Sequence, residues 1–164
     1  CSVFIIHARK ALLQGLSPKD NRTIPPLRYP LVFEMQKSFP GLDIILNGGL
    51  TDIKEMKSNV KNRVAGVMIG REAYQNPSIL LNVDREIFDQ KEKVRSMKDV
   101  IRNMIEYCNR EKAEGTAIKG ILKHLKGAFK GQANSKEFKR VLFCNETTDS
   151  EKLERLSNLV PIYC

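Results

Sequence analysis

Hydrophobic residues in the first half of the chain fall in short runs separated by polar or helix-type segments. The runs are residues 3–7 (VFIIH), 43–46 (DIIL) and 64–69 (VAGVMI). Short β-branched runs of this kind are typical of buried parallel strands. Between them, Pro30 stands where a helix can begin, and Thr51 and Asp52 can cap another helix. The order β–loop–α, β–α, β–α predicts a parallel α/β architecture.

Beyond residue 84 the hydrophobic period becomes helical throughout. After a charged connection over residues 84–95, apolar residues recur at steps of three and four from 94 to 108, 118 to 129, 138 to 142 and 153 to 159. The expected helix starts are polar capping residues: Thr116, then Asn134 or Ser135, then the capping box of Thr148 and Glu151. The pattern predicts two domains, an α/β domain over residues 1–84 and an all-α helical bundle over residues 85–164.

Charge adds a candidate partner. The 164 residues carry 28 Lys and Arg against 19 Asp and Glu, a net charge of +9. Residues 116–140 hold seven of these cations and one acid, Glu137; four of the cations have the spacing of one helical stripe: Lys119, Lys123, Lys126 and Lys130. The long loop after the first strand contributes Arg9, Lys10, Lys19, Arg22 and Arg28. Two basic clusters favour a polyanion, and since no base-reading motif is present we expect a folded RNA recognised by shape.

Other classes of protein are disfavoured. No apolar run approaches the ~20 residues that span a bilayer, so we expect no membrane-spanning helix and no membrane partner. The four cysteines form no CxxC or Cys/His pair, which argues against a disulfide framework or a metal site. We therefore expect reduced thiols, no metal and a cytoplasmic location, with an organelle as the alternative. The chain opens on a strand-like run without Met or leader, as a chain that starts inside a fold would.

Unusual residues follow each of the three predicted strands. They are His7; Asn47, Gly48 and Gly49; and Gly70 and Arg71. Because parallel strands present their carboxyl ends at one edge, we expect these residues to meet there. Glycine lets backbone N–H groups approach an anion, and an arginine grips a phosphate in two places. Each feature alone also fits an ordinary turn, a core histidine or a solvated arginine, but their recurrence favours a phosphate-bearing ligand.

Three motifs together resemble a known family. HARKALLQGLSPKDNRTIPPL (residues 7–27), NGGL (47–50) and GVMIGREAYQNP (66–77) are similar to the flavin-dependent tRNA-dihydrouridine synthases, most of all to the A-type subfamily. The resemblance implies the C-terminal part of an FMN-binding (β/α)₈ TIM barrel, followed by a helical tRNA-binding domain. It also implies the activity: NADPH reduces the flavin, hydride passes to C6 of a D-loop uridine, and a cysteine protonates C5.

The resemblance also implies roles for individual residues. His7 matches the FMN-contacting histidine; the residues that match the two parts of the FMN phosphate site are Asn47, Gly48, Gly49, Gly70 and Arg71. Lys19 and Arg22 match positions that contact tRNA. Lys136 and Lys139 match a pair that the family usually fills with arginines, which keeps the charge but loses the bidentate grip.

No catalytic residue is assigned to this chain. The family's proton-donating cysteine lies on an earlier strand than any predicted here, and Cys1 does not match it. We therefore expect the last three barrel strands and the helical domain, inactive alone and monomeric as a full-length enzyme. Two other functions remain open: a non-catalytic tRNA-binding fragment, and another FMN- or phosphate-binding barrel oxidoreductase that acts on a small molecule.

Overall fold

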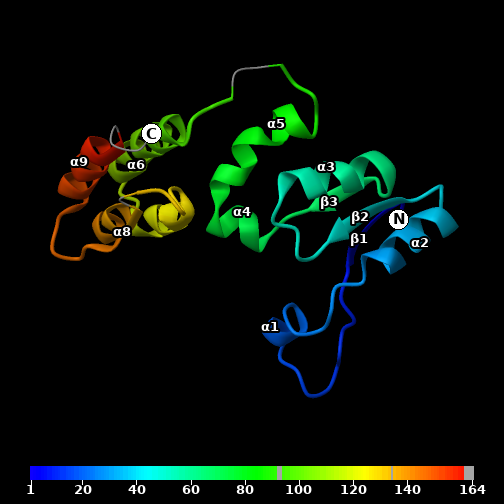
Figure 1. The fold of residues 1–164 in the computed structure, drawn as a ribbon. Helices are drawn as coiled ribbons and strands as arrows, with labels where there is room; N and C mark the ends of the chain where they lie inside the picture. Colours follow the sequence, from blue (N-terminus) through cyan, green and yellow to red (C-terminus); the bar gives the residue numbers. More distant parts are fainter. Residues whose placement is uncertain (92–93, 134, 161–164) are drawn as a thin grey trace. The chain divides into compact units, whose positions relative to one another are not determined.

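A computed structural model describes residues 1–91, 94–133 and 135–160. Its sheet has three parallel strands in the order β1 (Val3–His7), β2 (Asp43–Asn47) and β3 (Gly66–Met68) (Figure 1). His7 is in register with Asn47, and Asn47 with Met68, so the three strands end at the same edge. The fold is thus mixed helix and strand with an open parallel sheet, as the sequence pattern predicts, and β3 is shorter than expected.

The sheet packs against α2 (Tyr29–Ser38) and α3 (Ile53–Asn62). Alternate residues of a strand share a face, and Ile44 and Leu46 of β2 are both buried, together with Val32 of α2 and Met56 of α3. Asp52 caps α3 as predicted, accepting hydrogen bonds from the next residues' backbone N–H groups. The long loop before α2 contains a short helix, α1 (Pro18–Asn21), which the sequence analysis did not predict.

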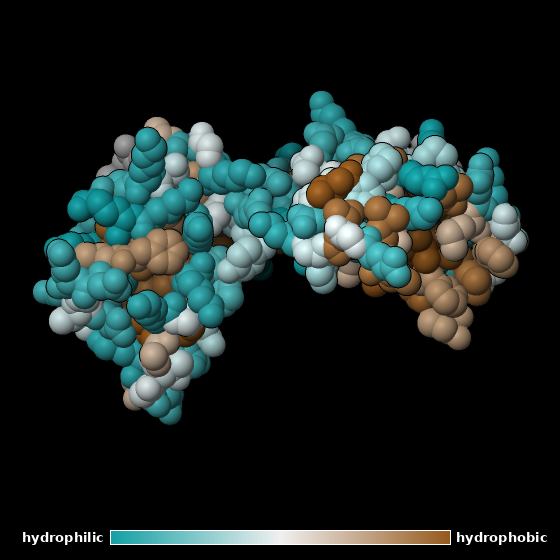
Figure 2. Space-filling model, turned by 90° about the horizontal axis from the view of Figure 1, so that it is seen from below, coloured by the Kyte–Doolittle hydropathy of each residue, from teal (hydrophilic) through white to brown (hydrophobic). Residues whose placement is uncertain are grey.

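Much hydrophobic surface of this part stays exposed. On and just after α2, Val32 is buried whereas Leu31, Met35 and Phe39 are exposed. The residues of β1 from Val3 to Ile5 are exposed as well. Figure 2 shows brown, hydrophobic surface spread over the sheet-bearing part of the chain. The described residues of this part therefore leave several large hydrophobic side chains uncovered.

The chain forms two compact units. The sheet unit is residues 1–72 and 83–90 and includes α5 (Val83–Glu86); the helical unit is residues 73–82 and 91–164, as far as these are described. The elements outside the sheet unit are α4 (Arg71–Gln75, which begins in it), η1 (Pro77–Asn82), α6 (Met97–Ala113), α7 (Lys119–Leu122), η2 (Lys123–Gly127), α8 (Ser135–Phe143) and α9 (Asp149–Leu159). The division between residues 84 and 85 stays a prediction.

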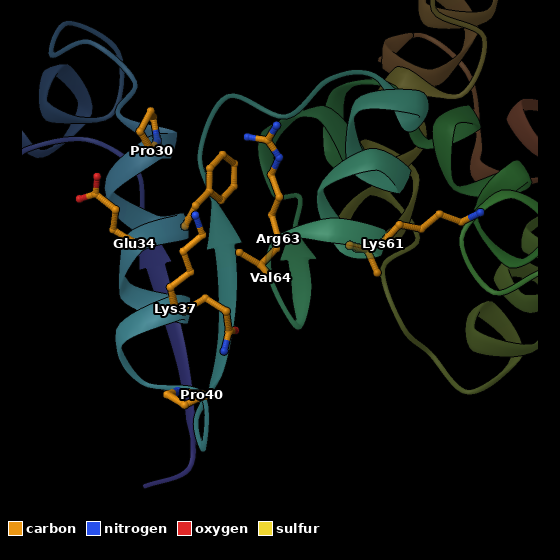
Figure 3. Close-up of a pocket in the computed structure, with 10 residues that line it drawn as sticks. Pro30, Glu34, Lys37, Pro40, Lys61, Arg63 and Val64 are labelled. Atoms are coloured by element: carbon orange, nitrogen blue, oxygen red, sulfur yellow. The ribbon is translucent and has the colours of Figure 1, made fainter.

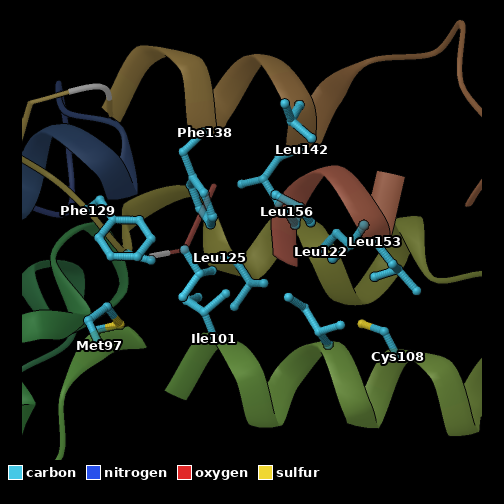
Figure 4. Close-up of a cluster of buried hydrophobic side chains, with 14 of the residues drawn as sticks. Met97, Ile101, Cys108, Leu122, Leu125, Phe129, Phe138, Leu142, Leu153 and Leu156 are labelled. Atoms are coloured by element: carbon cyan, nitrogen blue, oxygen red, sulfur yellow. The ribbon is translucent and has the colours of Figure 1, made fainter. Parts of the chain in front are cut away.

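The helical unit buries a continuous core of its own (Figure 4). The rings of Phe129 and Phe138 meet edge to face, 4.8 Å apart, and Ile101 of α6 and Leu156 of α9 are fully buried in the same cluster. Thr148 and Glu151 form the predicted capping box at the start of α9. None of the helices in the described ranges is long and apolar enough to cross a membrane.

One expected helix start was wrong. The helix after the charged connection over residues 84–95 begins at Met97, where Ser96 and Asp99 form a capping box. Thr116 caps no helix; its hydroxyl donates to the Glu111 carboxylate instead. Asn134, the alternative start for α8, lies outside the described residues.

The basic stripe is not on one α-helix. After the single turn of α7 the chain tightens into the 3₁₀ helix η2, so Lys119, Lys123, Lys126 and Lys130 do not share the face that a 3.6-residue period would give them. Glycines at 120 and 127 lower the α-helix propensity of this segment. All four lysines are nevertheless exposed, so the charge remains at the surface.

We expect Ser96→Ala to lower the free energy of unfolding by about 0.5–2 kcal/mol, because the Ser96 hydroxyl accepts a hydrogen bond from the Asp99 N–H that the helix cannot otherwise satisfy. Chemical denaturation measures this. The control is Ser157→Ala, at an exposed position inside α9, which should not lower the free energy of unfolding. Equal losses in both variants would contradict the capping role.

Candidate functional site

The residues singled out at the strand ends lie together at the carboxyl edge of the sheet. His7 and Asn47 are register partners, and the N–H of Ala8 donates to the carbonyl of Asn47 at 2.7 Å. Met68, the last residue of β3, is in register with Asn47, so Gly70 and Arg71 follow at the same edge. A histidine, a glycine turn and an arginine therefore lie at the carboxyl ends of the three strands, at one edge of the sheet, as the sequence predicts.

The imidazole of His7 packs directly on the backbone of Gly48. A Cβ at Gly48 would lie 3.1–3.4 Å from three atoms of the ring, which is tighter than most Cβ contacts, so the ring would have to shift. Gly48 has φ +115° and Gly49 has φ +72°, both in the region that favours glycine. A Cβ at Gly49 would overlap Leu27. Both glycines are therefore required by the conformation and by the neighbours.

Backbone donors of this turn are available to an anion. Among the hydrogen bonds of the described residues, none is donated by the N–H of Gly48 or Gly49. The first turn of α3 is different, because the Asp52 carboxylate already accepts from two of its N–H groups. The turn, rather than the start of α3, therefore offers the donors. Tyr29 steadies it from the other side, since its hydroxyl donates to the Gly48 carbonyl at 2.7 Å.

Arg71 joins this edge to the long loop. Its side chain is exposed, and Nη2 donates to the carbonyl of Arg22 at 2.9 Å. Arg22 in turn donates from Nε to the Pro18 carbonyl at 3.0 Å, across α1. An exposed guanidinium has further donors in its fork, so Arg71 can hold the loop and meet an anion as well.

The base of the loop is closed by backbone pairing. Arg9 and Leu27 form an antiparallel bridge, and the N–H of Arg28 donates to the Ala8 carbonyl at 2.7 Å. The Arg9 guanidinium is directed inward and donates to the Pro25 carbonyl. The sequence analysis expected Arg9 to join a basic cluster at the surface of the loop. The structure instead shows that Arg9 holds the loop closed.

The pKa of His7 is lowered from its ordinary value of 6.5, mainly because burial disfavours the charged imidazolium. Three guanidinium groups add to the effect: those of Arg9, Arg71 and Arg22. His7 is thus neutral near pH 7, with one ring nitrogen donating and the other accepting. The same three cations make this edge of the sheet favourable for an anion.

The four predicted RNA-contacting residues divide between the two units. In the sheet unit, Lys19 lies on α1 and Arg22 directly after it, both exposed. In the helical unit, Lys136 is exposed and Lys139 half-buried on α8. On the same helix the charge of Arg140 is offset by Glu137, whose carboxylate accepts from Arg140 Nη2 at 2.6 Å. Neither Lys136 nor Lys139 takes part in the salt bridges of the described residues, which leaves their charge available to a partner.

A surface groove lies away from this edge. It runs between α2 and the end of α3, and its lining includes Phe33, Lys37, Arg63 and Val64 (Figure 3). The Arg63 guanidinium lies 4.7 Å from the centre of the Phe33 ring. Val64 precedes β3, so the groove reaches the start of that strand while the candidate site lies at strand ends. No cluster of three metal-ligating side chains occurs in the described parts of the chain.

Comparison with known proteins identifies the family. A family model described as dihydrouridine synthase matches residues 1–161. The chain belongs to the dihydrouridine synthase family. It is 46% identical over 142 residues to the tRNA-dihydrouridine(20/20a) synthase of Escherichia coli K12, covering 87% of this chain and 41% of that protein. It is 43% identical over 163 residues to the Salmonella typhi synthase of the same name, covering 98% of this chain and 49% of that protein.

A third relative, the tRNA-dihydrouridine(20/20a) synthase of Haemophilus ducreyi, is 40% identical over 151 residues, covering 92% of this chain and 46% of that protein. The predicted resemblance to the A-type subfamily is therefore confirmed. The chain spans a little under half the length of these curated relatives.

The edge of the sheet has the features of an anion site. A Cβ at Gly48 would crowd the His7 ring, the turn presents backbone donors, and Arg71 supplies a charged fork at the same edge. Gly70 differs from the other glycines because it has an ordinary φ and open space around it. Gly70 is therefore assigned to the site because it follows β3 at this edge, and its backbone conformation does not require glycine.

Sequence reasoning missed the residues that support this turn. Tyr29 holds the Gly48 carbonyl, and Leu27 packs under Gly49. Both lie some twenty residues before the turn, and nothing in their local pattern marks them for this role. The one available signal is the motif itself, since Leu27 closes the stretch that resembles the dihydrouridine synthases.

We expect Gly48→Ala to lower the free energy of unfolding by about 1–3 kcal/mol, because the new methyl group meets the His7 ring and the backbone keeps a positive φ. Denaturation curves measure the loss. Gly41→Ala is the matched control in the same unit, with open space around the new Cβ and no positive φ, and should be neutral. A stable Gly48→Ala protein would refute the tight packing of His7 on the turn.

We expect the imidazole of His7 to titrate below pH 6.5 in flavin-free protein, as burial and the nearby arginines require. A pH series of histidine NMR spectra, assigned with His7→Gln, measures it. Because the unfolded chain binds this proton more tightly than the folded protein, stability should fall as the pH is lowered through 6.5 towards the folded pKa. Titration above 6.5 would contradict the assignment.

Proposed function

We propose that this protein acts in the FMN-dependent reduction of uridine to 5,6-dihydrouridine in the tRNA D-loop, with NADPH as the reductant. The observation that carries the proposal is the cluster of His7, the Gly48–Gly49 turn and Arg71 at the carboxyl edge of a parallel sheet. Because the chain belongs to the dihydrouridine synthase family, we interpret this cluster as the site for the phosphate of FMN. We further propose that the sheet unit is the C-terminal part of a (β/α)₈ barrel.

The cofactor phosphate would be held by the turn and by Arg71. The N–H groups of Gly48 and Gly49 donate without side-chain obstruction, Asn47 adds an amide, and Arg71 contributes a charge-assisted hydrogen bond. His7, neutral because its pKa is lowered, orients the bound group by hydrogen bonding without adding charge. When bound and reduced, the flavin supplies the hydride that the reaction needs. No catalytic acid is assigned to any residue of this chain.

The RNA would be held by cations in both units. Lys19 lies on α1 and Arg22 directly follows it. Lys136 and Lys139 lie on α8, and we propose that the helical unit is a tRNA-binding bundle. Contacts of this kind neutralise phosphates and release counterions, so affinity should depend strongly on salt. The relatives are named for uridines 20 and 20a, and we propose the same positions here. We also propose a cytoplasmic, monomeric enzyme.

Arg71→Ala in the full-length protein should weaken FMN retention by about 1–3 kcal/mol, or roughly 5- to 150-fold in Kd, because one charge-assisted phosphate contact is lost. Flavin fluorescence during dialysis measures retention, and dihydrouridine content of treated tRNA measures turnover. Both should fall in the variant.

Arg63→Ala provides the control, since Arg63 is another exposed arginine of the sheet unit but packs over Phe33 away from the site. It should retain flavin normally. Unchanged flavin retention in Arg71→Ala would refute the phosphate assignment. Wild-type protein that neither binds flavin nor forms dihydrouridine would refute the proposed function.

A further inference from the structure

An exposed aromatic pair in the helical unit has no role in the proposed cofactor site. Tyr74 lies on α4 and His124 on η2, fifty residues apart in sequence. The Tyr74 hydroxyl is 3.2 Å from Nδ1 of His124, and the two rings are 5.8 Å apart at an angle of 76°. Tyr74 is 54% exposed, although aromatic rings of the same unit such as Phe129 and Phe138 are buried. The pair therefore presents aromatic surface to solvent.

The position of the pair is fixed by close backbone packing. A Cβ at Gly127 of η2 would lie 2.5 Å from the Gln75 carbonyl oxygen and 2.9 Å from Cδ of Pro77. The segment that follows Tyr74 therefore rests directly on the backbone of η2, which only glycine at 127 allows. The next residues of this segment reach the core, where Leu81 packs against the buried cluster. The segment that directly follows Tyr74 is thus held in place beside its contact with His124.

Positive charge surrounds the pair along η2. Lys123 and Lys126 flank His124 and are exposed, whereas Leu125 between them is buried. From residue 115 to residue 136 the sequence has no Asp or Glu. An aromatic surface set among exposed lysines favours a ligand that combines flat rings with negative charge. A nucleic acid strand has both.

We propose that Tyr74 and His124 form a stacking site for an unpaired base of the RNA, with Lys123 and Lys126 contacting the adjoining phosphates. The inference rests on the proposed function and names a contact within it. Stacking on a tyrosine face needs no particular base, while the phosphate contacts set the strand's path. The hydroxyl contact with His124 limits rotation of the Tyr74 ring, so less freedom is lost when a base binds.

Binding of a tRNA transcript by the full-length protein over a series of salt concentrations tests the site. Tyr74→Ala should weaken binding about 5- to 150-fold at every salt concentration without changing the salt slope, because stacking releases no counterions. Tyr74→Phe, which keeps the ring, should bind within about threefold of wild type. Lys126→Ala should instead make the slope shallower by about one unit.

Two control variants make the result specific. Tyr107→Ala removes another partly exposed tyrosine of the helical unit, on α6 beside Arg110, and should bind like wild type. Lys19→Ala reports the electrostatic contact of the proposed function in the sheet unit. If Tyr74→Ala unfolds, as thermal melting shows, Tyr74→Leu keeps apolar bulk without an aromatic face and should show the same loss.

Normal affinity of folded Tyr74→Ala or Tyr74→Leu, with Lys19→Ala weakened, would overturn the stacking site and leave the proposed function intact. Equal losses in the Tyr74 and Tyr107 variants would also overturn it. Wild-type protein without tRNA affinity would overturn both the proposed function and this inference.

Discussion

The contact between the His7 ring and the backbone of Gly48 organises the candidate site. Strand register sets His7 opposite Asn47, so the chain leaving β2 passes under the imidazole. A Cβ at that point would press on the ring, and the positive φ of Gly48 is a conformation that favours glycine. The positions of Tyr29 and Leu27 follow from this turn, because one holds its carbonyl and the other fills the space beneath Gly49. A small steric constraint therefore determines where backbone donors meet the edge of the sheet.

Arg71 connects two parts of the proposed function within the sheet unit. It follows β3 at the edge that would hold the cofactor phosphate, yet it donates to the carbonyl of Arg22 in the loop that would contact RNA. Its charge also contributes to lowering the pKa of His7. Binding an anion at this edge would offset that positive charge and favour protonation of His7. In the proposed function, the cofactor, His7 and the RNA-contacting loop would thus be linked through the Arg71 guanidinium.

Local sequence patterns predicted the strands and most of the helices, and they predicted that the strands end at one edge of the sheet. The strand runs, the Asp52 cap and the capping box of Thr148 are encoded by residues close in sequence, and the structure confirms them. Contacts between distant residues were not predictable in this way. Gly127 opposes Gln75 and lies in a 3₁₀ helix where hydrophobic periodicity predicts an α-helix. Composition alone predicts a solvated Arg9, whereas its guanidinium donates to the carbonyl of Pro25 across the closed loop.

The two units differ in how fully they bury their hydrophobic residues, and this bears on where activity can be measured. The helical unit encloses a cluster that runs from Met97 to Val160. In the sheet unit, β1 leaves Val3, Phe4 and Ile5 exposed. Exposed hydrophobic strands are surfaces that proteins normally cover. Because the curated relatives are about twice as long as this chain, flavin and RNA binding should be compared between variants in the full-length protein, where a loss can be attributed to the residue changed.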